Sequence, residues 1–316
     1  MNAFSTIITP DYIHYALALR ESLIRFNTEI NFFILVTEKD EELKEKIEKK
    51  YPGVTVFFGQ ELCKDGIGKK IYDKYFNNLK DEFRWSMKPV LLKYLIEKLN
   101  FDKVLYLDCD IFFFNSYDFL FEKLETSRVI LTPHWRSMNP HLDEVNFQIQ
   151  FNEGLYNAGF VGVNKNSIEI LDWWAMVCEY VCVKQPEKGY YVDQSHLNLF
   201  QIKFDSVEIL KHKGCNVAAW NQLECKRTIG KDGKVLINDE FPVVFIHFTN
   251  STIKEIMMEI DYLLKPHLQE YAAALNKIDP SFDLIAKHIQ NVSNYHKPEN
   301  DKWGIKKIKK LFSDGN

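Results

Sequence analysis

The amino-acid sequence predicts an α/β protein with a mainly parallel central sheet, flanking helices and a C-terminal helical extension. Strand-like and helix-like segments alternate in the N-terminal part, as is typical of parallel strands joined by crossover helices. The chain has 316 residues, of which 46% are hydrophobic, so it can bury a large core. Its last part reads as helix and becomes rich in lysine.

The N-terminal elements can be assigned from their patterns. "FSTIITP", "NFFILVT" and "GVTVFF" are apolar enough to be buried strands, and they alternate with the helical patterns "DYIHYALALRESLIRF" and "DEELKEKIEKKY". Asp11 is a suitable N-cap for the first helix. The segment "KDGIGKK" lacks the spacing of a phosphate-binding loop, and we expect an ordinary loop there.

The later elements continue the same architecture. A helix over "SMKPVLLKYLIEKL" leads into the strand "KVLYLD", and "SRVILT", "YNAGFVGVN" and "FPVVFIHF" are further strands, with a helix over "SIEILDWWAMVCEYVCV". Residues 133–154 form a long irregular segment between strands. Because long loops in compact folds usually serve a function, we expect this segment to lie at the site.

Bulk properties exclude several classes. A net charge of −4, from 40 basic and 44 acidic residues, predicts no nucleic-acid partner. Six cysteines without a C-x-x-C pair indicate reduced thiols in a cytosol. We expect no signal peptide in "MNAFSTIITP", because it lacks a charged leader followed by an apolar run, and no membrane span, because no run of 18 apolar residues exists. We therefore expect a cytoplasmic protein.

Two carboxylates interrupt the apolar segment "KVLYLDCDIFFFN". Unpaired carboxylates in a buried strand cost several kcal/mol, so Asp108 and Asp110 need a compensating partner. Residues two apart on a strand share a face, and α/β sheets bind ligands at the carboxyl ends of their strands. Two oxygen ligands suit Mg²⁺ or Mn²⁺ bridging to substrate phosphates, whereas the competing interpretation is two exposed turn aspartates. A phosphatase of the haloacid dehalogenase type would carry this motif nearer its N-terminus and an acidic motif downstream.

This strand resembles the D-x-D strand of GT-A nucleotide-sugar glycosyltransferases, which have a Rossmann-like fold. The similarity is greatest to the glycosyltransferase family 8-like branch and to bacterial nucleotide-diphospho-sugar transferases. It continues in order through "YNAGFVGVN", "LDWW", "GYYVDQSHLNLF", "GCNVAAWN" and "FIHF". Because it covers about residues 3–250, we expect a catalytic domain in residues 1–250 and a helical extension in residues 251–316.

The resemblance implies a donor site and a metal site. Thr9, Asp11 and Tyr12 match residues that hold the nucleotide base, although a helix cap explains them equally well. His247 matches the third metal ligand beside Asp108 and Asp110, where the alternative is a buried core histidine.

Further matches concern the donor sugar. Lys88 matches a lysine that meets the phosphate or the sugar, and Asn157 matches a residue that hydrogen-bonds a sugar hydroxyl. Asp193 and Gln194 match the pair that faces the donor sugar, and we expect these two residues to be catalytic, although Asp193 can also cap a helix.

The sequence departs from the family after His247. Members often carry a glycine three residues later and a lysine six residues later that grips the diphosphate. Here Asn250 and Ile253 occupy those positions, and Lys254 follows one residue late. Arg136 in the long segment is a candidate replacement.

The resemblance implies metal-dependent transfer of a sugar from a nucleoside-diphosphate sugar, with a UDP-hexose favoured, to a glycan or lipid-linked acceptor in surface polysaccharide assembly. Family 8-like enzymes retain the anomeric configuration; an inverting enzyme would need a base, for which Asp193 is the first candidate. The alternatives are a sugar-nucleotide-binding protein without transferase activity and a nucleotidyltransferase, which would open with a glycine-rich loop that this chain lacks.

The tail "DKWGIKKIKKLF", residues 301–312, is basic and amphipathic. Its apolar residues share one arc of a helical wheel and its lysines fill the other side. We expect either a terminal helix packed on the body or a peripheral contact with an anionic membrane surface on the cytoplasmic side.

Overall fold

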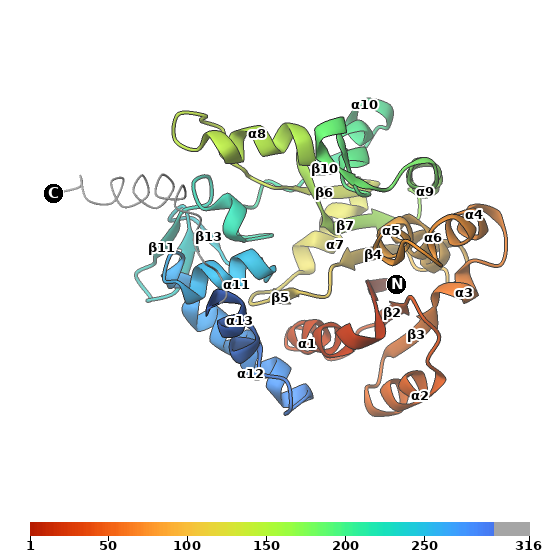
Figure 1. The fold of residues 1–316 in the computed structure, drawn as a ribbon, viewed down its shortest axis with the longest axis horizontal. Helices are drawn as coiled ribbons and strands as arrows, with labels where there is room; N and C mark the ends of the chain where they lie inside the picture. The colour runs from red at the N-terminus through yellow and green to blue at the C-terminus, as the bar shows by residue number, and fades with distance from the viewer. Residues whose placement is uncertain (294–316) are drawn as a thin grey trace.

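A seven-stranded sheet forms the centre of the computed structural model, which describes residues 1–293. The strand order is β10-β6-β7-β4-β1-β2-β3, and every neighbouring pair is parallel except the two pairs that β7 makes with β4 and β6. The predicted mainly parallel sheet is therefore confirmed (Figure 1). The strands are β1 Asn2–Ile8, β2 Phe32–Val36, β3 Val54–Phe58, β4 Lys103–Leu107, β6 Val129–Pro133, β7 Tyr156–Asn164 and β10 Val207–Ile209.

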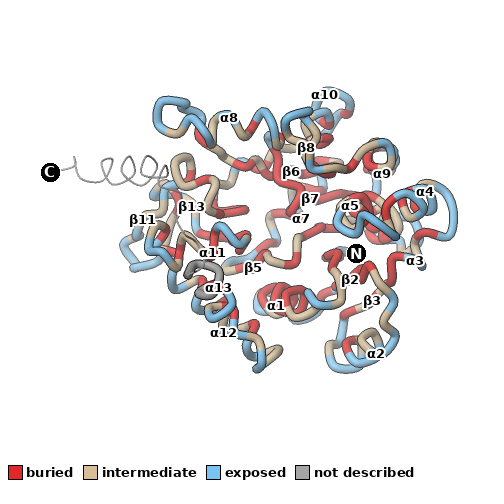
Figure 2. The backbone as a smooth tube through the Cα atoms, in the orientation of Figure 1, coloured by how far each residue is buried: buried red, intermediate tan, exposed pale blue. Residues whose placement is uncertain are grey.

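Helices cover both faces of this sheet because its strands are apolar on both sides. Phe4 and Ile8 of β1 point into one core cluster, while Ala3 and Ile7 point into another. The first cluster includes side chains of α1 Ile13–Leu23, α2 Glu41–Lys50 and α7 Asp118–Thr126. The second includes side chains of α4 Gly66–Tyr75, α5 Lys80–Ser86, α6 Lys88–Glu97 and α9 Ile168–Tyr180. Figure 2 shows the buried strands in red between these partly exposed helices.

Smaller elements complete the body. Strand β5 Ile111–Phe113 pairs with β14 Phe245–His247. A three-stranded sheet has β12 Val235–Ile237 at its centre, between β11 Arg227–Ile229 and β13 Phe241–Pro242. Strand β8 Lys184–Gln185 pairs with β9 Tyr190–Tyr191. The short helices α3 Gly59–Leu62 and α10 Phe200–Lys203 connect larger elements.

Helices α11 Asn250–Met257, α12 Lys265–Ile278 and α13 Leu284–Ser293 form the predicted helical extension. Figure 1 shows them together beside α1, and α1 contacts α12. Leu268 and Leu275 of α12 belong to the same core cluster as the buried side chains of α1. The tail of residues 301–312 lies outside the described residues.

Three local predictions were wrong. Asp11 does not cap a helix: Pro10–Tyr12 forms a 3-10 turn before α1, and the Asp11 carboxylate accepts from the Thr9 hydroxyl. The segment "KDGIGKK" begins α4, whose Ile71 and Tyr75 are buried, so packing outweighs the two glycines.

The third wrong prediction concerns residues 133–154. This segment contains helix α8 Glu144–Glu153, capped by the Asp143 carboxylate, which accepts from the Asn146 backbone N–H at 2.9 Å. The helix gives a weak periodic signal because Val145 and Phe151 are exposed while Gln150 is buried.

Candidate functional site

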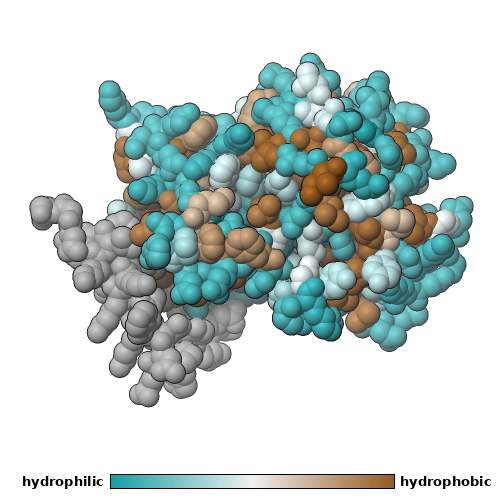
Figure 3. Space-filling view, turned by 90° about the horizontal axis from the view of Figure 1, so that it is seen from above, coloured by the Kyte–Doolittle hydropathy of each residue, from teal (hydrophilic) through white to brown (hydrophobic). Residues whose placement is uncertain are grey.

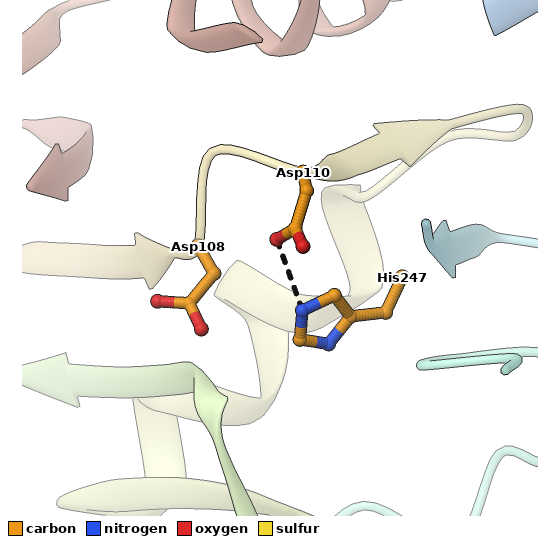
Figure 4. Close-up of side chains that lie close together, drawn as sticks. All are labelled: Asp108, Asp110 and His247. Atoms are coloured by element: carbon orange, nitrogen blue, oxygen red, sulfur yellow. Dashed lines mark ion pairs between the residues drawn. The ribbon is translucent and has the colours of Figure 1, made fainter. Parts of the chain in front are cut away.

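Asp108 and Asp110 lie in the tight turn between β4 and β5, and not within a strand as the sequence predicts. The backbone N–H of Asp108 donates to the Gly159 carbonyl of β7 at 2.7 Å, and the Ile111 N–H donates to the Asp108 carbonyl at 3.1 Å. The turn brings the two carboxylates to the same side without strand geometry (Figure 4). Both side chains are about one-third exposed or less, at 28% and 30%.

His247 reaches the two aspartates because β14 pairs antiparallel with β5. In that register His247 lies opposite Ile111, the residue after Asp110. Its imidazole Nε2 is 3.0 Å from Asp110 Oδ1, and the imidazole Nδ1 is 3.3 Å from Asn216 Oδ1 (Figure 4). Two segments more than 130 residues apart in the sequence thus meet at one point.

Asp108, Asp110 and His247 form a cluster that fits a divalent cation, since each offers one ligand atom and these atoms lie within 4.8 Å of one another. Carboxylate oxygens and imidazole nitrogen are ligands that Mn²⁺ accepts. Burial acts to raise the pKa of Asp108, but the charges of Lys88 and His247 hold this pKa below its usual value. Burial acts to lower the pKa of His247, but Asp110 outweighs it and raises this pKa. Both shifts show that the two carboxylates favour a positive charge between them.

Lys88 and Asp193 form a buried ion pair beneath the cluster. Lys88 Nζ is 3.1 Å from Asp193 Oδ2 and 3.6 Å from Asp108 Oδ1, and it donates to the Ala158 carbonyl at 3.0 Å. The side chains of Lys88 and Asp193 are only 4% and 0% exposed. Burial raises the pKa of Asp193 to about 6, against the opposing effect of Lys88. Gln194, and not Asp193, precedes the following 3-10 helix, so Asp193 is not a helix cap.

A hydrogen-bonded amide network lies beside this pair. Asn157 Nδ2 is 3.2 Å from His134 Nε2, and the backbone N–H of Ala158 donates to Gln194 Oε1 at 3.2 Å. Gln194 Nε2 donates to the Glu153 carbonyl at 2.8 Å, which attaches the end of α8 to the network. Burial lowers the pKa of His134 to about 3, so its imidazole is neutral and accepts from an amide.

These groups surround a pocket of about 520 Å³. The pocket is lined by seven residues that the sequence predicts for the donor and metal sites, namely Thr9, Tyr12, Asp108, Asp110, Asn157, Gln194 and His247. Lys88 and Asp193 lie below the lining, and Asp11 lines an adjoining pocket that also contains Thr9. The structure thus brings the predicted residues to one region, in two layers.

Arg136, the candidate from the long segment, also lines the pocket, whereas the sequence did not point to several other lining residues. Arg84 of α5, Glu153 at the end of α8, Tyr191 and Trp220 all contribute to the pocket. Trp220 belongs to the quoted segment "GCNVAAWN", which was a usable signal. Arg84 and Glu153 lie on helices with ordinary polar patterns, so only the fold reveals them.

The sheet with its D-x-D turn and lining residues is the fold of GT-A glycosyltransferases. The chain matches the family model described as glycosyl transferase family 8 over residues 4–254. It therefore belongs to glycosyl transferase family 8, an enzyme family whose members use nucleotide-sugar donors.

Among known proteins, the chain is 26% identical to the uncharacterized protein YfnF of Bacillus subtilis over 315 residues, covering 92% of this chain and 99% of that protein. It is similar in fold to mouse xyloside xylosyltransferase 1, with a TM-score of 0.50, 14% identity, and coverage of 80% of this chain and 99% of that one. The glycosyltransferase GlyE of Streptococcus pneumoniae is 20% identical with a TM-score of 0.41; the match covers 67% of this chain but only 45% of the GlyE chain.

Proposed function

We propose that this protein transfers a hexose from a nucleoside-diphosphate sugar, with UDP-hexose favoured, to a glycan or lipid-linked acceptor in surface polysaccharide assembly. The observation that carries this proposal is the convergence of Asp108, Asp110 and His247 in a pocket that Asn157 and Gln194 also line. Such an arrangement suits a nucleotide sugar, because metal ligands lie beside polar groups that can hold a sugar ring.

Asp108, Asp110 and His247 would hold Mn²⁺ or Mg²⁺. When bound, this ion supplies a positive charge that stabilises the leaving nucleoside diphosphate. Lys88 lies 3.6 Å from Asp108 and fixes the carboxylate from below. Thr9, Asp11 and Tyr12, at the end of β1, would contact the base, since Thr9 is common to the main pocket and the adjoining one.

Asn157 and Gln194 would contact the donor sugar, because both line the pocket and belong to one hydrogen-bonded network. Asp193 would act differently from Gln194. Its carboxylate is fully buried against Lys88 and is therefore poorly placed to take a proton from an acceptor hydroxyl. This burial supports retention of the anomeric configuration over inversion with Asp193 as the base.

An apolar surface beside the pocket supports an acceptor with a lipid part. Exposed apolar side chains lie on α8 and its flanks, on α10, and in the 3-10 helix Ser195–Leu199 that precedes α10, where Asn198 Oδ1 accepts from the Leu155 N–H. They are Met138, Leu142, Val145, Phe151, Leu155, Leu199 and Ile202. Figure 3 views the molecule from this side and shows brown patches among the teal ones. No helix within residues 1–293 is long and apolar enough to cross a membrane.

The proposal is tested by incubating the purified protein with UDP-hexoses and Mn²⁺ and measuring the release of free sugar and UDP. We expect slow donor hydrolysis that needs the metal and that Asp110→Asn abolishes without changing the melting temperature. Substitution of the exposed Asp205 by Asn is the matched control and leaves hydrolysis unchanged. Donor binding without turnover would favour the non-catalytic alternative, and release of pyrophosphate from a nucleoside triphosphate would favour a nucleotidyltransferase.

A further inference from the structure

The pocket carries few cationic side chains for a ligand with two phosphates. Of the described residues that line it, Asp81, Asp108, Asp110 and Glu153 are acidic, whereas only Arg84 and Arg136 carry a permanent positive charge. A bound metal ion offsets the two carboxylates that ligate it, so the departing diphosphate needs a further donor. The two arginines are the candidates, because Lys88 is paired with Asp193 and does not line the pocket.

The segment after β14 does not provide this cation. Ile253, where a lysine would be expected, is 2% exposed and packs in the core cluster of α1 and α12. Lys254 is not among the residues that line the pocket.

Arg136 is already committed to helix α8. Its Nη1 donates to Asn146 Oδ1 at 2.9 Å, and its Nη2 pairs with Glu153 Oε2 at 2.6 Å. The side chain is 11% exposed, and Glu153 neutralises its charge inside the same pocket. Binding a phosphate would require Arg136 to leave two partners that hold α8 in place.

Arg84 is differently arranged. It stands in the last turn of α5 and lines the pocket with Thr9, Asp108 and Asp110. Its Nη2 donates to Asp81 Oδ1 at 3.2 Å in an ion pair whose carboxylate side chain is 65% exposed. An ion pair with such an exposed carboxylate contributes little to stability, so an incoming anion can replace Asp81 at a small cost in free energy. A guanidinium also fits two phosphate oxygens at once.

We infer that Arg84 binds the diphosphate of the nucleotide sugar, exchanging Asp81 for phosphate oxygens when the donor enters. This inference rests on the proposed function, because it assumes a nucleoside-diphosphate ligand. It makes α5 a wall of the donor site, since Arg84 lines the same pocket as His247.

The test is calorimetric titration of the full-length protein with UDP in the presence of Mn²⁺, together with uridine binding measured by ligand-observed NMR. Arg84→Gln should weaken UDP binding about 10- to 100-fold, because a charge-assisted hydrogen bond is lost. The affinity for uridine should not change, because uridine has no phosphate. Arg84→Lys keeps the charge but loses the planar fork, so it should bind UDP with intermediate affinity and guards against a folding defect.

Arg136→Gln is the matched control. It should lower the melting temperature by releasing α8 but weaken UDP binding less than Arg84→Gln does. If folded Arg84→Gln binds UDP within about twofold of the wild type, or if Arg136→Gln loses more affinity, the role of Arg84 is overturned while the proposed function stands. If the wild-type protein binds neither UDP nor GDP with Mn²⁺, the proposed function itself fails.

Discussion

At the scale of single residues, the site depends on the absence of a side chain at Gly159. Gly159 lies on β7 directly against the candidate metal cluster of Asp108, Asp110 and His247. A Cβ atom there would lie 2.6 Å from His247 Cε1, 2.7 Å from Asn157 Oδ1 and 3.0 Å from Asp108 Oδ2. These separations are shorter than van der Waals contact, so the cluster has its present geometry only because this residue has no side chain.

Gly159→Ala should therefore weaken Mn²⁺ binding by about 10-fold or more, because it displaces two ligands of the cluster. Isothermal titration with Mn²⁺ measures this directly. Gly162→Ala on the same strand is the control, since its Cβ would meet mainly the flexible ends of Leu105 and Leu124. We expect that variant to lose some stability and keep its metal affinity; equal Mn²⁺ affinity in both variants would contradict the prediction.

The buried pair of Lys88 and Asp193 gives a second prediction at this scale. Asp193→Ala leaves the Lys88 ammonium buried without its nearest carboxylate, so the free energy of unfolding should fall by about 3 kcal/mol. Donor turnover should fall more than the affinity for free UDP. Urea denaturation and steady-state kinetics measure the two effects.

A double variant, Lys88→Met with Asp193→Leu, separates stability from function. Replacing a buried ion pair by apolar side chains is often neutral for stability, so the double variant should recover much of the lost stability. Its turnover should stay low, because Asp108 has lost the cation beneath it. A double variant with wild-type turnover would show that the pair is only structural.

At the scale of elements, the C-terminal helices are joined to the site through Arg227 of β11. Its guanidinium pairs with Asp261 at 2.9 Å and donates to the Ala218 carbonyl at 2.7 Å, next to the segment that carries Trp220. Both members of the ion pair are buried, at 4% and 5% exposure. Glu255 of α11 lies beside this pair and accepts from Gln222.

Glu255 should make stability depend on pH. Burial, together with repulsion from Asp261, raises the pKa of Glu255 to about 7, above its unfolded value of 4.5. Between these values the folded protein binds more protons than the unfolded chain, so the free energy of unfolding falls as pH rises from 4.5 to about 7. Glu255→Gln should reduce this fall, as measured by denaturation at pH 5 and pH 8.

Glu259→Gln is the matched control on the same segment, since Glu259 is 71% exposed and its ion pair within residues 1–293 is with the exposed Lys265. Its pH dependence should equal that of the wild type. If Glu255→Gln and the wild type lose stability equally over this pH range, the carboxylate of Glu255 does not titrate as expected.

At the scale of the whole molecule, the apolar surface of α8 and α10 and the basic tail raise the same question of membrane contact. The tail lies outside the described residues and stays a prediction from the sequence. Full-length protein should sediment with anionic liposomes at low salt, and deletion after Asn300 should weaken this, because each lysine near an anionic surface contributes about 1 kcal/mol. Binding should also fall at high salt. Failure of the full-length protein to sediment at low salt would favour a soluble acceptor.

The sequence by itself determined the fold class and most of the candidate site. Alternation of apolar strands and amphipathic helices predicted the sheet, because this periodicity is local. The apolar residues of β1, β2 and β3 are mostly buried in the structure, as their sequences indicate. The identities of Asp108, Asp110 and His247 followed from motifs, and seven of the predicted residues line one pocket.

Only the tertiary structure decided how these residues meet. Pairing of β5 with β14 places His247 beside Asp110, and this register depends on contacts between distant segments that no local pattern encodes. The fold also separates the roles of two residues that are adjacent in the sequence. Gln194 lines the pocket, whereas Asp193 is fully buried below the lining. The role inferred for Arg84 depends on which partners the folded chain gives to each arginine. Electrostatic function follows from neighbours in space, and for this protein those neighbours come mostly from elsewhere in the chain.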